Sequence, residues 1–526
     1  MIIDFRNLAD GTSIDTDLCI IGAGPAGITL AREFIGTDVR VCLLESGGEE
    51  PEEETQDLCD GETIGRPYFP LDGTRIRTLG GTSYHWMGRC GPFLPNEMGD
   101  REWVPHGGWP ITRQELDPFY LKAHDICELG PFEYGPENWH HIGIPEPEFD
   151  PKKLETRFWR FSPPTRFGPK YRDALEQATN LSVYLNASVT NIQSTDDGNQ
   201  ISRVDFRSLS GNFGHVTSRM FVLACGGMDN PRLMLASNRV EPAGLGNRHD
   251  LVGRFFMEHL EADCAEIVSA DPANLVRMFA RNRKSPVMIH AGICPTEQWQ
   301  RESRILNSSM TIEYIPDVES GVGAAKTMVT DIQKGRIPKD LGSRLWQILT
   351  DLDEVAPAAY ARLIKDEPLV SGIKSMFMWS RQEQAPNPES RITLSPEKDA
   401  TGMNRVSLNW QLTELDKHTA RTVSHMIATE MGHLGLARLK LPDWLIEGGK
   451  GWDPKMHGAN HHMGTTRMAD NPKRGVVDRN CQVHGIENMY VAGSSVFSTS
   501  GYVNPTLTIV ALSLRLADHL KARQFA

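Results

Sequence analysis

The chain has 526 residues, more than one hydrophobic core usually supports, so two closely connected domains are expected. A formal net charge of -13 argues against a nucleic-acid partner, because phosphate binding requires a basic surface. No apolar run reaches the roughly 18–20 residues that span a bilayer. Residues 1–17 lack the apolar stretch of a secretory leader, so a cytoplasmic protein is expected unless a partner subunit carries it out.

The first predicted unit is a strand, a glycine-rich turn, a helix and a second strand. The apolar run Leu18–Ile21 predicts the first strand, Ile28–Ile35 the helix and Val39–Leu44 the second strand. Residues 22–27 read Gly-Ala-Gly-Pro-Ala-Gly, and Glu45 directly follows the second strand. This order is that of a dinucleotide-binding βαβ unit.

Four residues of this unit have specific expected roles. Gly22 permits the tight turn, Gly24 lets a pyrophosphate approach the backbone, and Gly27 lets helix and strand pack closely. The N–H groups and dipole at the helix N-terminus favour the phosphates. Glu45 can accept hydrogen bonds from the ribose hydroxyls. The motif fits FAD and NAD equally, so the choice of cofactor rests on other segments.

The nine cysteines contain no C-x-x-C pair, which argues against zinc ribbons and iron–sulfur clusters. His457 and His461 have the i, i+4 spacing of a metal-binding pair. Gly458 and Pro454 argue against a continuous helix there, and H-E-x-x-H does not occur. No metal site is therefore expected.

Three further parts of the chain carry family-specific patterns. They are Gly80-Gly81-Thr82-Ser83-Tyr84-His85-Trp86 with Gly107-Gly108-Trp109-Pro110-Ile111, Leu223-Ala224-Cys225-Gly226-Gly227-Met228-Asp229-Asn230-Pro231-Arg232, and His461-His462-Met463-Gly464-Thr465-Thr466-Arg467-Met468 with Asn488-Met489-Tyr490-Val491-Ala492-Gly493 and Asn504-Pro505-Thr506-Leu507-Thr508. Together they resemble the glucose-methanol-choline (GMC) family of flavoprotein oxidoreductases. Within that family the C-terminal run is most similar to pyranose oxidases, bacterial sugar dehydrogenases and glycoside 3-oxidases.

The resemblance implies FAD as cofactor and an α/β fold, α+β overall. A Rossmann-type FAD-binding domain would be interrupted by a substrate-binding domain of mainly antiparallel sheet and helices. In this chain the FAD-binding domain is expected at residues 1–260 and 451–526, and the substrate-binding domain at 261–450. Strand-like runs at Arg391–Leu394 and Arg405–Trp410 agree with a sheet in the second domain.

Oxidation of an alcohol removes a hydroxyl proton and a hydride from one carbon, and the proton requires a base with a pKa near neutrality. Histidine, with an unperturbed pKa of about 6.5, is suited to this task. In the family the base is the histidine that opens H-x-[VM]-G-T, here His461, and the hydride goes to flavin N5. The second catalytic position is Asn504, whose amide can hold the substrate hydroxyl at any pH. A turn asparagine before Pro505 is the alternative interpretation.

The resemblance also assigns a set of residues to FAD. Beyond the βαβ unit they are Gly81, Ser83, His85, Trp86, Gly226, Gly493, Asn504 and Thr506. His85 stands where pyranose oxidases carry a histidine bonded covalently to the flavin, but a non-covalent histidine beside the ring is the favoured interpretation. The predicted last helix, Leu507–Leu520, would direct its N-terminal amides at the flavin and stabilise negative charge on the reduced ring.

Gln382 and Gln384 are the candidate substrate-binding residues. The run Met376–Gln384 predicts a strand on the cavity floor, and these two side chains share one strand face. From there they could bind sugar hydroxyls. A solvated polar face is the alternative.

The resulting hypothesis is FAD-dependent oxidation of a secondary hydroxyl, at C2 or C3 of a sugar or glycoside, to a ketone. One alternative is oxidation of a non-sugar alcohol, favoured if both glutamines face away from the flavin. A non-redox flavoprotein lyase is disfavoured by retention of His461 and Asn504. Oxygen, a quinone or a cytochrome could accept the electrons, so both an oxidase and a dehydrogenase fit.

Two kinds of protein partner are expected from the resemblance, a small accessory subunit or further copies of the chain. Residues 324–365 read as helical with glycine and proline interruptions. This excursion could serve as a lid, an oligomerisation arm or a docking surface.

Overall fold

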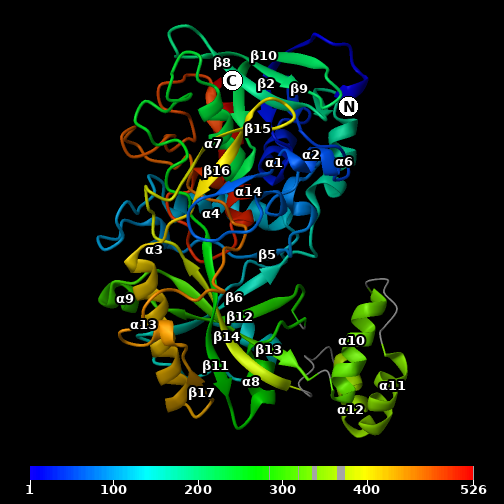
Figure 1. Cartoon of the computed structure of the whole chain (residues 1–526), viewed down its shortest axis with the longest axis vertical. Coiled ribbons are helices and arrows are strands. Elements are labelled where there is room, and N and C mark those ends of the chain that lie inside the picture. The colour runs from blue at the N-terminus through cyan, green and yellow to red at the C-terminus, as the bar shows by residue number, and fades with distance from the viewer. Residues whose placement is uncertain (284, 318, 334–339, 364–372, 525–526) are drawn as a thin grey trace.

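The computed structural model describes residues 1–283, 285–317, 319–333, 340–363 and 373–524, which form three sheets with helices around them (Figure 1). The helices are α1 (Pro25–Arg32), α2 (Glu53–Asp57), α3 (Pro95–Met98), α4 (Arg113–Ile126), α5 (Trp139–Ile142), α6 (Phe167–Gln177), α7 (Gly226–Ala236), α8 (Pro272–Phe279), α9 (Glu297–Ser303), α10 (Gly321–Gln333), α11 (Leu341–Thr350), α12 (Leu352–Leu363), α13 (Glu414–His433) and α14 (Thr506–Gln524).

The first sheet is mainly parallel and is the predicted dinucleotide-binding sheet. Its path is β1 (Ile2–Asp4), β7 (Leu181–Leu185), β3 (Val41–Leu44), β2 (Thr12–Ile21), β10 (Phe213–Leu223), β9 (Ile201–Arg207) and β8 (Ser188–Ser194), with β18 (Met489–Val491) pairing parallel to β10. Every residue of β3 is buried, as helices on both faces of a parallel sheet require. The predicted βαβ unit is confirmed, with the helix beginning earlier than expected because Pro25 fits the first helical turn.

The second sheet is antiparallel throughout and lies below the first in Figure 1. Its order is β17 (Arg438–Lys440), β11 (His259–Val268), β14 (Ile373–Glu383), β13 (Ser308–Pro316), β12 (Ile289–Pro295), β6 (Leu154–Phe161) and β5 (Arg89–Cys90). The two sheets together confirm the expected fold class, a Rossmann-type α/β part joined to an antiparallel sheet with helices.

A third, small sheet changes the expected assignment of two strands. β15 (Arg391–Lys398) pairs with β16 (Asn404–Asn409), which runs parallel to β4 (Gly61–Thr63). β15 and β16 pack beside α7, the helix that follows β10 of the first sheet. They were expected in the antiparallel sheet instead. The boundaries at residues 260 and 450 stay a prediction, although β5 and β6 join the antiparallel sheet from earlier in the chain.

Helices α10, α11 and α12 form a separate arm beside the antiparallel sheet (Figure 1). They confirm the helical excursion for the described residues, whereas 334–339 and 364–365 of that prediction lie outside them. The arm exposes several large apolar side chains, namely Val329, Leu341, Leu345, Trp346, Leu349, Leu352 and Tyr360. Within the described parts of the chain, no helix is both long and apolar enough to cross a membrane.

Candidate active site

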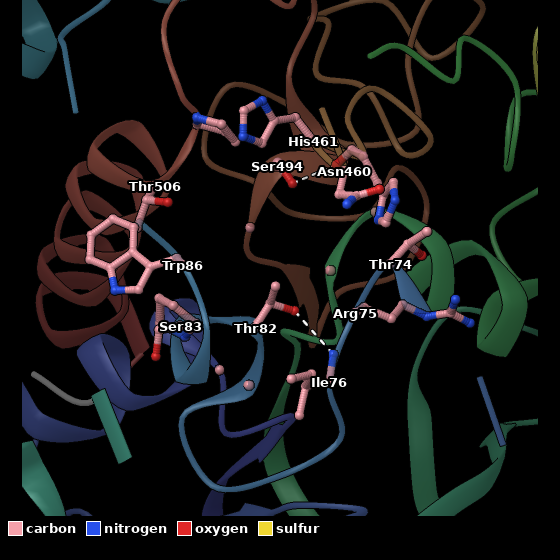
Figure 2. A pocket seen from close by; sticks show the side chains of 18 of the residues that line it. Thr74, Arg75, Ile76, Thr82, Ser83, Trp86, Asn460, His461, Ser494 and Thr506 are labelled. Carbon is pink, nitrogen blue, oxygen red and sulfur yellow. Dashed lines mark hydrogen bonds between the residues drawn. The ribbon is translucent and has the colours of Figure 1, made fainter. Parts of the chain in front are cut away.

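A cavity of about 870 Å³ lies where the first two sheets meet. Its wall includes the carboxyl ends of β2 and β3 together with side chains of β14 from the antiparallel sheet. Figure 2 shows Trp86 and Thr506 on one side, Thr74 on the other, and His461 at the end away from Ile76. The cavity therefore joins the predicted cofactor residues to the predicted catalytic residues.

The cofactor end is built on the βαβ turn. Gly22 has a positive φ of 103°, and a Cβ there would lie 2.7 Å from the carbonyl oxygen of Ala224. The Glu45 carboxylate accepts the N–H groups of Ala23 and Gly47, at 2.8 and 2.9 Å. Burial raises the pKa of Glu45. The carboxylate is thus fixed at the end of β3, inside the cavity wall.

The open space at this end fits FAD. A Cβ placed on Gly24, Gly226 or Gly493 would meet nothing within 4 Å, and all three residues line the cavity. Gly24 precedes α1 and supplies no side-chain cap, which leaves the amides at the helix N-terminus available for a pyrophosphate. The lining residues from the predicted FAD set are Gly22, Gly24, Glu45, Gly81, Ser83, His85, Trp86, Gly226, Gly493, Asn504 and Thr506.

Gly27 is the one residue of that set outside the cavity lining. A Cβ there would lie 1.9 Å from the carbonyl oxygen of Gly22, so its role is the close packing of helix on strand. His85 lines the cavity and is half-buried, and burial lowers the pKa of its ring. A covalent bond between His85 and a flavin stays a prediction.

The catalytic end holds three side chains in a row. His461 Nδ1 lies 2.8 Å from His259 Nδ1, and His461 Nε2 lies 3.1 Å from Asn504 Nδ2. The structure therefore brings together the two predicted catalytic residues and adds a second histidine behind them. His461 and Asn504 line the cavity, whereas His259 is fully buried.

The protons on this row can be assigned from its two ends. His259 Nε2 lies 3.2 and 3.0 Å from the carbonyl oxygens of Ser500 and Gly501, which can only accept, so Nε2 carries the proton. Burial lowers the pKa of His259 to about 3, so the ring is neutral and its Nδ1 is an acceptor. His461 must then donate from Nδ1, which leaves a lone pair on its Nε2.

The other end gives the same answer. Arg381 Nη1 lies 2.5 Å from Asn504 Oδ1, and a guanidinium can only donate, so the Asn504 amide is oriented with its oxygen toward Arg381. Asn504 Nδ2 then donates to His461 Nε2. Arg381 is itself held by Glu261, through Nε at 2.8 Å and through Nη2. Both ends therefore place the basic lone pair of His461 on Nε2, beside Asn504.

Backbone pairing explains how His461 reaches His259. Met257 and Met463 exchange N–H to O bonds of 2.9 and 3.0 Å across an antiparallel bridge, so the two histidines lie opposite each other. The Glu258 carboxylate accepts the N–H of His461 at 3.0 Å, and burial raises the pKa of this carboxyl to about 7. Asn460, with φ of 59°, makes the left-handed turn that precedes His461.

Burial, followed by the neighbouring His259 and Arg381, lowers the pKa of His461 well below 6.5. The ring is therefore neutral at pH 7, as a general base must be before it takes a proton. His462 points away from this row, with its ring stacked on Phe256 at 5.9 Å between centroids.

The two glutamines predicted to bind substrate do not line the cavity. Gln382 donates to the carbonyl oxygen of Asp416 at 2.8 Å, and Gln384 bonds the carbonyl oxygen of Gln411, both as fully buried side chains. Alternate residues of a strand face opposite sides, so the cavity side of β14 is instead Phe377, Trp379 and Arg381. The strand lies at the cavity as predicted, but the face that it turns toward the cavity is the opposite one to the face predicted.

Sequence reasoning also missed Glu258, His259, Glu261 and Arg381. One signal was available: Glu258, His259 and Glu261 are polar residues that interrupt an apolar run beginning at Phe255. Buried charges in such a run are rare without a partner or a function. Their partners come from Tyr68, from β14 and from residues 459–504, which no local pattern connects to them.

The mainly parallel sheet, the glycine turn at a cavity and a neutral histidine at the cavity's other end fit the class of dinucleotide-dependent oxidoreductases. Residues 386–513 match the model of the family described as GMC oxidoreductase. The fructose dehydrogenase large subunit of Gluconobacter japonicus is 22% identical over 586 residues, covering 96% of this chain and 98% of that protein. Residues 386–513 therefore carry the C-terminal region of a GMC oxidoreductase acting on CH–OH groups, and this family implies FAD as the cofactor.

Two further comparisons agree. The 2-methyl-1,2-propanediol dehydrogenase of Mycolicibacterium austroafricanum is 23% identical over 575 residues, covering 97% of this chain and 96% of that protein. The crystal structure of a formate oxidase has a TM-score of 0.56 at 17% identity and covers 98% of this chain and 100% of that chain. This likeness shows the fold alone, and it is the mixed α/β fold described above.

Proposed function

We propose that the chain oxidises a secondary hydroxyl, at C2 or C3 of a sugar or glycoside, to a ketone. The observation that carries the proposal is the lone pair of His461 Nε2, held beside the Asn504 amide at the cavity wall. The similarity to a fructose dehydrogenase large subunit supports a polyhydroxylated substrate. That relative is a large subunit, which also supports a role for a further subunit beside this chain.

His461 and Asn504 would act on the same hydroxyl. A substrate hydroxyl would replace the present hydrogen bond between Asn504 Nδ2 and His461 Nε2. His461 Nε2 then accepts the hydroxyl proton, and Asn504 Nδ2 donates a hydrogen bond to the hydroxyl oxygen. The Nδ1–H of His461 stays bonded to His259 while the ring carries the extra proton. When bound, FAD supplies the acceptor for the hydride that leaves the same carbon.

Gly24, the N-terminus of α1 and Glu45 would hold the adenosine diphosphate part of FAD. Gly81, Trp86 and Thr506 also line the cavity, and Figure 2 shows Trp86 and Thr506 on one side of it. His259 is fully buried behind His461, so Nε2 takes the substrate proton from the cavity side.

A second candidate is a non-sugar alcohol, and one specific observation favours it. Gln382 and Gln384 face away from the cavity, so they supply no hydroxyl-binding groups. The diol dehydrogenase relative shows that small non-sugar alcohols are oxidised within this group of proteins.

Anaerobic reduction of the purified holoenzyme, followed at the flavin absorbance band, separates these candidates. The panel contains free sugars, O- and C-glycosides, diols and simple alcohols. Bleaching by sugars or glycosides, with recovery of a keto-sugar product, is the expected result. Bleaching by diols alone would show that the substrate is a non-sugar alcohol rather than a sugar or glycoside. Absence of bleaching by every alcohol would contradict the proposed function.

A further inference from the structure

Arg89 is a buried cation without an anion. It lies on β5 with 6% of its surface exposed, and its guanidinium stacks on Trp159 at 3.7 Å from the ring centroid. Nε and Nη2 are buried and have no hydrogen-bond partner, and no described carboxylate forms an ion pair with the group. A guanidinium stays charged, and a buried unpaired charge is strongly unfavourable. Such a group calls for an anionic ligand.

The charges around Arg89 leave one positive charge in excess. Arg89, Arg281 and Arg381 line this part of the cavity, together with the carboxylates of Glu261 and Glu313. Arg381 bonds Glu261 Oε1 through two nitrogens, so Glu261 and Glu313 together offset two of the three guanidinium charges. Burial, followed by Arg381, lowers the pKa of Arg89; Glu261 and Glu313 raise it and Arg281 lowers it, and the balance leaves the pKa well below its ordinary value.

The position of Arg89 separates it from the phosphate end of the cavity. Its charge acts on His461 and His259, both of which have their pKa lowered in part by Arg89. Arg89 lies on β5, which pairs with β6 in the antiparallel sheet, whereas the glycine turn and Glu45, where a pyrophosphate would lie, belong to the mainly parallel sheet. Arg89 therefore faces the place where a substrate meets the catalytic pair.

We propose that the cavity binds a hydroxy compound whose carboxylate pairs with Arg89, such as a sugar acid or a glycosiduronate. This inference rests on the proposed function, because it names the class of alcohol brought to His461. The planar fork of a guanidinium matches a carboxylate with two parallel hydrogen bonds. One excess positive charge also balances a carboxylate better than a phosphate ester, which carries about -1.5 to -2 at pH 7.

A matched pair of probes tests the inference. Methyl β-D-glucopyranosiduronate and methyl β-D-glucopyranoside differ only in a carboxylate or a CH₂OH group at C5 of the ring. Wild-type holoenzyme should be reduced by the first with the higher kcat/KM. In Arg89→Gln the ratio of the two kcat/KM values should fall roughly 10- to 100-fold, the effect of losing a hydrogen bond to a charged group.

Arg66 offers a matched control. It too stacks on a tryptophan, Trp452 at 5.4 Å, and has a buried Nε without a partner, but it lies outside the cavity lining. Arg66→Gln should keep the wild-type ratio. A thermal melt gives a second readout: the glucosiduronate should raise the Tm of wild-type holoenzyme and of Arg66→Gln, but not that of Arg89→Gln.

The outcomes separate the inference from the proposed function. A ratio that is the same in wild type and Arg89→Gln, with the neutral glycoside oxidised, would overturn the inference and leave the proposed function standing. Equal slowing with both probes would assign Arg89 to the cofactor and also overturn it. A preference for glucose 6-phosphate would overturn the carboxylate assignment. A melt shift specific to Arg89, without oxidation of any probe, would support the anion site while contradicting the proposed function.

Discussion

His259 should set the proton position on His461, and its replacement by phenylalanine tests this. The phenyl ring fills a similar volume but cannot accept from His461 Nδ1–H, which now bonds His259 at 2.8 Å. A buried donor left unpaired costs about 1–3 kcal/mol. Each 1.36 kcal/mol in the barrier is tenfold in rate. The cost falls on the tautomer of His461 that carries its proton on Nδ1 and its basic lone pair on Nε2. Flavin reduction should therefore slow roughly 5- to 150-fold.

The assay is anaerobic stopped-flow reduction of His259→Phe holoenzyme over a range of substrate concentrations. The limiting rate constant should fall while the substrate dissociation constant stays the same, because His259 lies outside the cavity lining. His259→Asn retains an oxygen that can accept from Nδ1–H, so it should restore most of the rate. His124→Phe, which removes a buried histidine on α4, should reduce at the wild-type rate.

If the flavin of His259→Phe were reduced at the wild-type rate, the argument that His259 selects the tautomer of His461 would be refuted. An equal loss in the phenylalanine and asparagine variants would mean that His259 acts through packing alone. The protons can also be observed directly in ¹⁵N-histidine-labelled protein, where Nδ1 of His461 should show as protonated and Nε2 as unprotonated.

Three further outcomes are expected. Since burial lowers the pKa of His461 well below 6.5, the limiting reduction rate should be independent of pH above 6.5 and fall only as pH drops through the lowered value; an acid limb centred above 6.5 would contradict this. Glu45→Ala should weaken FAD binding roughly 10- to 100-fold by removing ribose hydrogen bonds, measured as flavin retained after dialysis, and unchanged retention would make that contact dispensable. Gln382→Leu should lower the free energy of unfolding in denaturant by about 1–3 kcal/mol, because the Asp416 carbonyl loses its buried donor, without changing KM. A raised KM would restore Gln382 as a substrate contact.

The parts of the fold that local sequence could predict are those that local physics determines. The βαβ turn needs Gly22 and Gly27 because a Cβ at either would meet backbone atoms within 3 Å, and the glycines are visible in the sequence. His461 and Asn504 were predicted as a catalytic pair from family motifs, and the structure places the two side chains 3.1 Å apart.

The rest depends on pairing between distant segments. Gln382 and Gln384 were expected at the cavity because they share a strand face, but β14 presents Phe377, Trp379 and Arg381 to it. A shift of one residue reverses both faces of a strand, and only the partner strands fix that phase. His259 meets His461 across more than 200 residues, so the row that positions the base has no local signature.

The central claim is that His461 is the base for alcohol oxidation, and single-turnover reduction of His461→Ala tests it most directly. The variant should bind FAD as the wild type does, because its phosphate and ribose contacts lie at the other end of the cavity. Anaerobic reduction by the best alcohol of the panel should then slow by about 10²–10⁴-fold, the range for loss of a general base. Reduction at a near wild-type rate, with FAD bound, would contradict the account.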